Sequence, residues 1–152
     1  MTTDAILQYL HIAAILTVVV FLTSQAALCR PEWLNAKVVE RLGTVDRIYW
    51  IAMGAVLVTG VIRLLWGAKP PAFYAANWLL HAKVLMFLLM AALSIVASRA
   101  MARWRVALRA QGTLPDEAEI RRVRKLVMRA GHILPLIPLP AAFLARGFGF
   151  GG

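Results

Sequence analysis

The chain has 152 residues, with 17 Lys and Arg against 7 Asp and Glu and a net charge of +10. Hydrophobic residues make up 61% of it and the mean hydropathy is +0.73, which is too apolar for a water-facing surface and indicates an integral membrane protein. The basic residues stand between apolar runs of spanning length, so the charge indicates membrane topology and excludes a nucleic-acid-binding face. The single cysteine, Cys29, excludes an internal disulfide and a cysteine zinc site.

Four runs are long and apolar enough to cross a bilayer, which takes about 20 predominantly apolar residues each. They lie near residues 5–28, 46–66, 79–98 and 126–146. The first run begins with Asp4 and has no positive segment before it, so we expect a retained helix and not a signal peptide. The sequence predicts an all-α, integral membrane four-helix bundle that forms a single domain over residues 1–152.

The basic residues gather in two of the connections between these runs. Segment 29–47 holds four Lys or Arg and segment 99–129 holds nine, against four in the rest of the chain. Cytoplasmic loops of membrane proteins carry the excess of Lys and Arg. Both basic loops are therefore predicted to lie in the cytoplasm, with both termini outside.

Several residues near the ends of these runs indicate where helices begin, break or bend. Asp46 stands at the start of the second run, where a carboxylate can cap a helix. Lys69-Pro70-Pro71 breaks the chain before the third run, and Pro135 and the two prolines after it must bend or unwind the fourth. His132 lies near the inner end of the fourth run. It either satisfies carbonyls that the proline releases or marks a second site.

Polar side chains from three runs fall at one membrane level under this topology. His11 lies about 9 Å inside the first run, Arg63 is near the outer end of the second, and His81 is in the first turn of the third. Ionisable groups inside a membrane are costly and indicate a functional site. His81 and Lys83 are two residues apart, about 200° around a helix, so they cannot both face the bundle. The sequence leaves open which of the two does.

A neutral imidazole in an apolar bundle is a suitable axial ligand for heme iron. We therefore predict His11 and His81 as iron ligands of a b-type heme, with Arg63 and Lys83 placed to pair with its propionates. The alternative for each histidine is an interhelical hydrogen bond without a cofactor. No Ser or Cys nucleophile with a neighbouring base and no carboxylate pair is visible, so no catalytic residue is assigned.

The stretch V-D-R-I-Y-W-I-A-M-G-A-V-L-V-T-G-V-I-R-L-L-W-G-A-K-P-P-A-F-Y-A-A-N-W-L-L-H-A-K resembles the bacterial membrane-protein family known as domain of unknown function 2214. L-P-D-E-A-E-I-R-R-V-R-K and P-L-P-A-A-F-L-A-R-G-F-G resemble it too. The resemblance implies about four spans in a bacterial inner membrane and no particular activity.

A more distant likeness concerns Y-L-H-I-A-A-I-L and W-L-L-H-A-K-V, which are similar to the HemJ-type protoporphyrinogen oxidase family of small heme b membrane proteins. This resemblance implies that His11 and Lys83 are functional residues and that the substrate is porphyrin-like.

Two hypotheses of different classes follow. The first is a heme b redox protein, a heme-dependent membrane oxidoreductase that passes electrons from an outer-side donor to the quinone pool or oxidises a porphyrin-like substrate. The second is a non-enzymatic structural, assembly or transport component without a cofactor, in which the proline-broken run would line the site. Membrane lipid is a partner in both cases. Four short helices enclose little, so a homo-oligomer is compatible with either.

Overall fold

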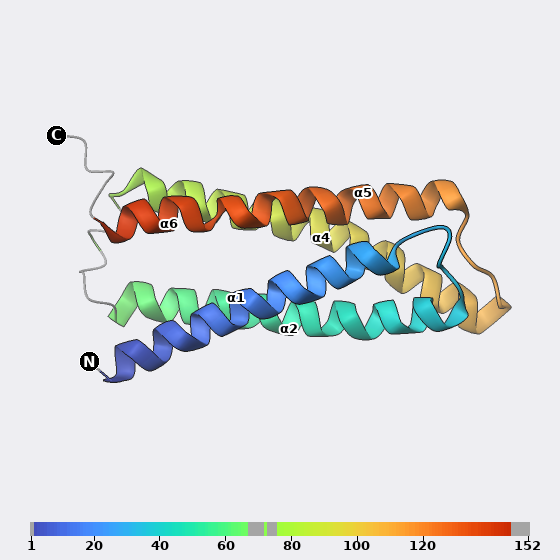
Figure 1. Ribbon diagram of the computed structural model, residues 1–152, viewed down its shortest axis with the longest axis horizontal. Coiled ribbons are helices and arrows are strands. Elements are labelled where there is room, and N and C mark those ends of the chain that lie inside the picture. Colours follow the sequence, from blue (N-terminus) through green and yellow to red (C-terminus); the bar gives the residue numbers. More distant parts are fainter. Residues whose placement is uncertain (1, 67–71, 73–75, 147–152) are drawn as a thin grey trace.

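The computed structural model describes residues 2–66, 72 and 76–146, and within these ranges the fold is all-helical. The elements in chain order are α1 (Thr2–Leu28), α2 (Ala36–Trp66), α4 (Trp78–Gln111), α5 (Glu117–Ile133), the 3-10 helix η1 (Leu134–Leu136) and α6 (Pro138–Ala145). The last three follow one another as one broken rod, so four rods lie side by side (Figure 1). This confirms the predicted all-α membrane bundle. The expected break at Lys69-Pro70-Pro71 lies outside the described residues.

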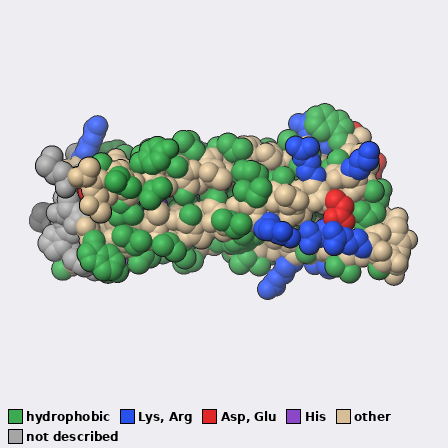
Figure 2. Space-filling view, turned by 90° about the horizontal axis from the view of Figure 1, so that it is seen from below, with side chains coloured by type: hydrophobic (Ala, Val, Ile, Leu, Met, Phe, Trp, Pro, Cys, Tyr) green, Lys and Arg blue, Asp and Glu red, His purple; other side chains and the backbone are tan. Residues whose placement is uncertain are grey.

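The rods form two antiparallel hairpins, α1 with α2 and α4 with the α5–α6 rod (Figure 1). The start of α1 and the end of α6 lie at one end of the bundle, which we call the terminal end. The α1–α2 and α4–α5 connections lie at the other, where Lys and Arg side chains gather (Figure 2), and we call this the basic end. Which side of the membrane the basic end faces stays a prediction of the positive-inside rule.

Three of the helices, α1, α2 and α4, are long and apolar enough to cross a membrane. Their 27, 31 and 34 residues correspond to about 40, 47 and 51 Å. The hydrocarbon core of a bilayer is about 30 Å thick, so α2 and α4 extend beyond it at the basic end. In the structure α2 begins at Ala36 and not near the predicted start at residue 46. Many apolar side chains of these helices are exposed and so contact lipid.

The fourth rod shows the predicted proline break. α5 begins after Asp116, whose side chain accepts the backbone N–H of Glu119 at 2.7 Å and caps the helix. The α-helix gives way to η1 around Pro135, because a proline supplies no N–H for the helical ladder. His132 Nδ1 bonds the carbonyl oxygen of Met128 at 2.6 Å. The imidazole therefore satisfies a carbonyl of α5, one that lies before those affected by the proline.

A polar bridge ties three helices together in the half of the bundle near the basic end. Asp46 Oδ1 accepts from Gln25 Nε2 of α1 at 3.0 Å and from Ser98 Oγ of α4 at 2.6 Å. Trp50 Nε1 donates to the same Ser98 oxygen at 2.9 Å. The predicted capping role of Asp46 is wrong, because α2 begins at Ala36, almost three turns earlier. The carboxylate instead connects helices across the bundle.

The buried core is concentrated in this basic half. Tyr49 is 0% exposed and its hydroxyl shares a 2.7 Å hydrogen bond with Ser94 of α4. On α2 the core cluster ends at Met53, and on α4 it begins at Met90. Among the described residues of α2, none beyond Met53 is buried. The two hairpins are therefore tightly packed in the basic half and leave space between them in the terminal half.

Candidate functional site: an intramembrane pocket

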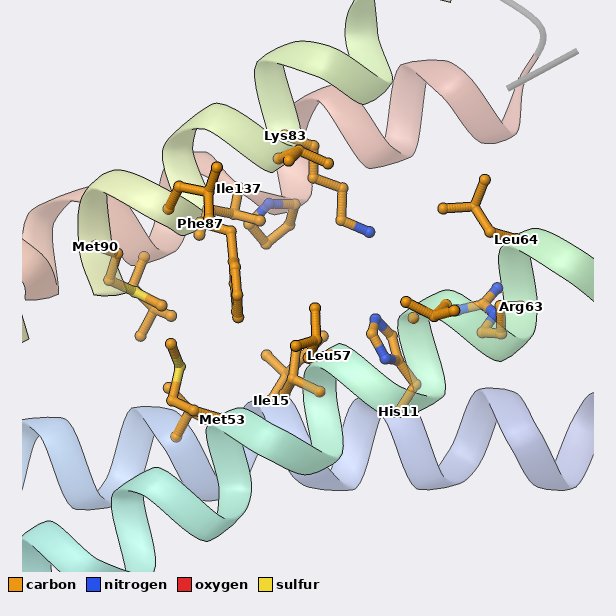
Figure 3. Close-up of a pocket in the computed structure, with 18 of the residues that line it drawn as sticks. His11, Ile15, Met53, Leu57, Arg63, Leu64, Lys83, Phe87, Met90 and Ile137 are labelled. Atoms are coloured by element: carbon orange, nitrogen blue, oxygen red, sulfur yellow. The ribbon is translucent and has the colours of Figure 1, made fainter. Parts of the chain in front are cut away.

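A pocket of about 330 Å³ lies between the two hairpins in the terminal half. Its wall is largely apolar and comes from α1, α2, α4, η1 and α6. The charged or titratable side chains that line it are His11, Arg63 and Lys83, one from each of the three spanning helices (Figure 3). Two members of the predicted level, His11 and Arg63, thus line one pocket, and its member from α4 is Lys83 and not the expected His81.

His11 is 5% exposed, and its ring packs against α2. Nδ1 lies 2.7 Å from the Thr59 hydroxyl oxygen, and that hydroxyl lies 2.6 Å from the Ala55 carbonyl oxygen. A hydroxyl has one hydrogen, which Thr59 donates to the carbonyl, so His11 Nδ1–H is the donor to Thr59. In the neutral ring this leaves the lone pair on Nε2. The ring is turned into the pocket toward Lys83 (Figure 3).

The imidazole of His11 packs against Gly60 of α2. A Cβ placed on Gly60 would lie 3.5 Å from His11 Cε1, which is an ordinary van der Waals distance. The ring of α1 therefore sits directly against the backbone of α2. Because glycine has no side chain, it permits this close approach.

Lys83 and Arg63 bring two cations to the same pocket. The Lys83 ammonium extends from α4 toward His11, and Arg63 lies on α2 nearer the terminal end (Figure 3). Among the described residues neither forms a salt bridge with a carboxylate. Two cations beside an apolar wall favour an anionic group at this end of the pocket.

His81 lies on α4 but is exposed and does not line the pocket. Lys83, two residues on, does, because the two positions point about 200° apart around the helix. The structure therefore brings His11 and Lys83 together and not His11 and His81. Ligation of iron by His81 stays a prediction, without support from this arrangement.

Thr59 is a residue of this candidate site that the sequence did not single out. It holds the Nδ1 side of His11 and so determines which nitrogen faces the pocket. A signal was present, because Thr59 stands four residues before Arg63 and hence on the same face of α2. A hydroxyl at that spacing can be expected to meet a polar neighbour.

The opposite end of the pocket is apolar. Met53 of α2 and Met90 of α4 are 3% and 1% exposed and lie at the end away from Arg63 (Figure 3). Ten residues of α2 separate Met53 from Arg63, a rise of about 15 Å. The site is therefore long, apolar over most of its depth and cationic at one end.

Fold and site together define an integral membrane protein with a pocket between two helical hairpins that is apolar over most of its depth and cationic at one end. The family model described as predicted membrane protein (DUF2214) matches residues 3–149, and the chain belongs to this family. That finding confirms the first resemblance noted in the sequence. No curated protein and no solved structure matches the chain. The more distant likeness to the HemJ-type family is not shown by these comparisons.

Proposed function

We propose that the protein binds b-type heme in this pocket and acts as a redox protein of the membrane. The observation that carries the proposal is the orientation of His11. Its Nδ1–H is held by Thr59 and its ring is turned into an apolar cavity, which leaves Nε2 available to a metal. Histidine ligands of metals are typically held in this way by a hydrogen bond from the second nitrogen.

The remaining pocket residues suit the rest of a heme. An apolar wall suits the faces of a macrocycle, while Arg63 and Lys83 offer cationic partners for propionates from two helices. Bound heme supplies one-electron chemistry. The chain's own contribution is to fix the imidazole, neutralise carboxylates and keep water from the apolar end. A quinone or a porphyrin-like molecule is the proposed redox partner.

The absorption spectrum of the purified protein tests this function. Protein isolated in detergent from heme-replete cells is expected to show a Soret band, with α and β bands on reduction. His11→Ala should remove these bands. His132→Ala serves as the matched control, because His132 is exposed and, among the described residues, its side chain bonds a carbonyl of its own helix. Colourless parent protein, or unchanged bands in His11→Ala, contradicts the proposal.

A His81→Ala variant separates the two candidate ligand sets. If the pocket geometry determines ligation, this variant keeps its bands and Lys83→Met binds hemin more weakly. If His81 ligates iron as the sequence suggested, His81→Ala loses or shifts the bands. Either result assigns the group on α4 that acts with His11.

The second candidate function, a cofactor-free binding or transport component, is favoured by one observation. Leu134, Ile137 and Pro138 line the pocket, so the broken part of the fourth rod forms one of its walls. Interrupted helices line binding sites in transporters. Under this alternative the purified protein has no Soret band and still binds an apolar anion in the pocket.

A further inference from the structure

The bonds between α2 and α4 are confined to the basic half of the bundle. Within the described residues, they join residues 40–50 of α2 to residues 94–109 of α4. The pairs are Glu40 with Arg109, Asp46 and Trp50 with Ser98, and Tyr49 with Ser94. The Glu40–Arg109 pair is bidentate, with both contacts at 2.7 Å. These bonds close the gap between the two helices at that end.

The hydrogen bonds and the ion pair named above do not extend to the terminal halves of α2 and α4. Leu57 and Val61 of α2 and Val84 and Leu88 of α4 line the pocket, yet their side chains are 54%, 45%, 45% and 56% exposed. A residue that both lines a pocket and is half exposed stands at an opening. Ile12 of α1 and Pro138 of α6 also line the pocket and are exposed, but they belong to the opposite side of it. The opening between α2 and α4 has the larger number of such residues. This opening lies along spanning helices, so it faces the hydrocarbon of the bilayer and not water.

We propose that the ligand reaches the pocket sideways from the bilayer, through the gap between the terminal halves of α2 and α4. The inference deepens the proposed function, because it requires that the pocket binds a ligand. The ligand class is a membrane-dissolved apolar molecule with an acidic group. Its acid lies at Lys83 and Arg63 and its apolar body points toward Met53 and Met90, because the cations are at one end of the pocket and the methionines at the other.

A tryptophan placed at the opening should slow this passage. Leu88→Trp and Val61→Trp enlarge side chains that line the pocket at the gap. Leu85→Trp and Val58→Trp are the matched controls, since these residues lie on the same helices, are 67% and 57% exposed, and do not line the pocket. Each full-length variant is reconstituted in vesicles without heme and mixed with donor vesicles that carry hemin.

Uptake is followed by the growth of the Soret band, and release by transfer of hemin to empty acceptor vesicles. We expect both rates to fall several-fold in Leu88→Trp and Val61→Trp, with unchanged final occupancy and unchanged rates in the controls. Equal rates in all four variants overturn the proposal. A lower occupancy without slower release also overturns it, because the tryptophan then fills the site and does not guard its opening.

A second probe separates this inference from the heme proposal. A photoactivatable stearic acid dissolved in the vesicles is cross-linked by light, and the labelled segments are mapped by mass spectrometry. Label on segments 57–64 and 80–88 that declines in Lys83→Met supports lateral access of an acidic apolar molecule, even if no variant shows a Soret band. A Soret band in the parent together with unslowed uptake in the opening variants leaves the heme proposal standing and refutes the route.

Discussion

Replacing Thr59 by valine tests the arrangement that holds His11. The Thr59 hydroxyl accepts a hydrogen bond from His11 Nδ1–H, with 2.7 Å between the nitrogen and the oxygen. Valine keeps the branched shape and removes that acceptor. His11 is 5% exposed, so water cannot fully replace the lost bond. In a soluble protein an unpaired buried donor costs about 1–3 kcal/mol. Interhelical hydrogen bonds in membranes average about 0.6 and reach about 1.7 kcal/mol, because the separated helices find other partners in the bilayer. We therefore expect Thr59→Val to lower the free energy of unfolding by the smaller amount, about 0.6 to 1.7 kcal/mol.

The effect on ligand binding should be the larger one. Without Thr59 the imidazole of His11 can exchange its tautomer and turn, so Nε2 is no longer fixed toward the pocket. Loss of such a supporting partner typically lowers metal affinity about 10- to 100-fold, which corresponds to about 1.4–2.7 kcal/mol. Hemin titration followed at the Soret band gives this affinity, and unfolding by sodium dodecyl sulfate gives the stability.

Thr59→Ser is the control, since it keeps the hydroxyl and should bind hemin nearly as the parent does. Hemin affinity in Thr59→Val equal to that of the parent would refute the reasoning. A loss in Thr59→Ser as large as in Thr59→Val would do so as well, because the hydroxyl would then not be the group that matters.

Three further predictions concern the basic half. Burial raises the pKa of the Cys29 thiol from 9.0 to about 12, so this group adds no pH dependence to the free energy of unfolding below about pH 9. Between about pH 9 and 12 the free energy of unfolding should fall by up to about 1.4 kcal/mol per pH unit, because the thiol ionises in the unfolded chain and not in the folded one. Comparison of unfolding curves with Cys29→Ala isolates this contribution. Asp46→Ala should destabilise the bundle by about 1–3 kcal/mol, because the buried Gln25 amide and the half-buried Ser98 hydroxyl lose their acceptor. Asp46→Asn retains an oxygen and should lose less stability, which unfolding in detergent will show. Gly43→Ala introduces a Cβ that meets Arg105 Nη1, so the Arg105 side chain must move. The gain in stability of about 1 kcal/mol from helix propensity should therefore appear fully only when Arg105 is also replaced by alanine. A double-mutant cycle measures this difference.

The sequence by itself determined the class of protein, three of the spans and the break in the fourth rod. These features are local. Hydropathy and length decide whether a segment can cross a bilayer, and Pro135 removes a helical hydrogen bond whatever surrounds it. The common level of His11 and Arg63 also followed from counting residues along each run, because helical rise converts sequence distance into depth.

The tertiary structure decided which side chains meet. Lys83 lines the pocket and His81 does not because packing of α4 against its neighbours sets the rotation of the helix, and hydrophobicity around α4 is too even to reveal that rotation. Asp46 bonds Gln25 and Ser98 instead of capping a helix, since α2 continues to Ala36. The open terminal half likewise depends on how two hairpins diverge, which is a property of helix packing that no single segment encodes.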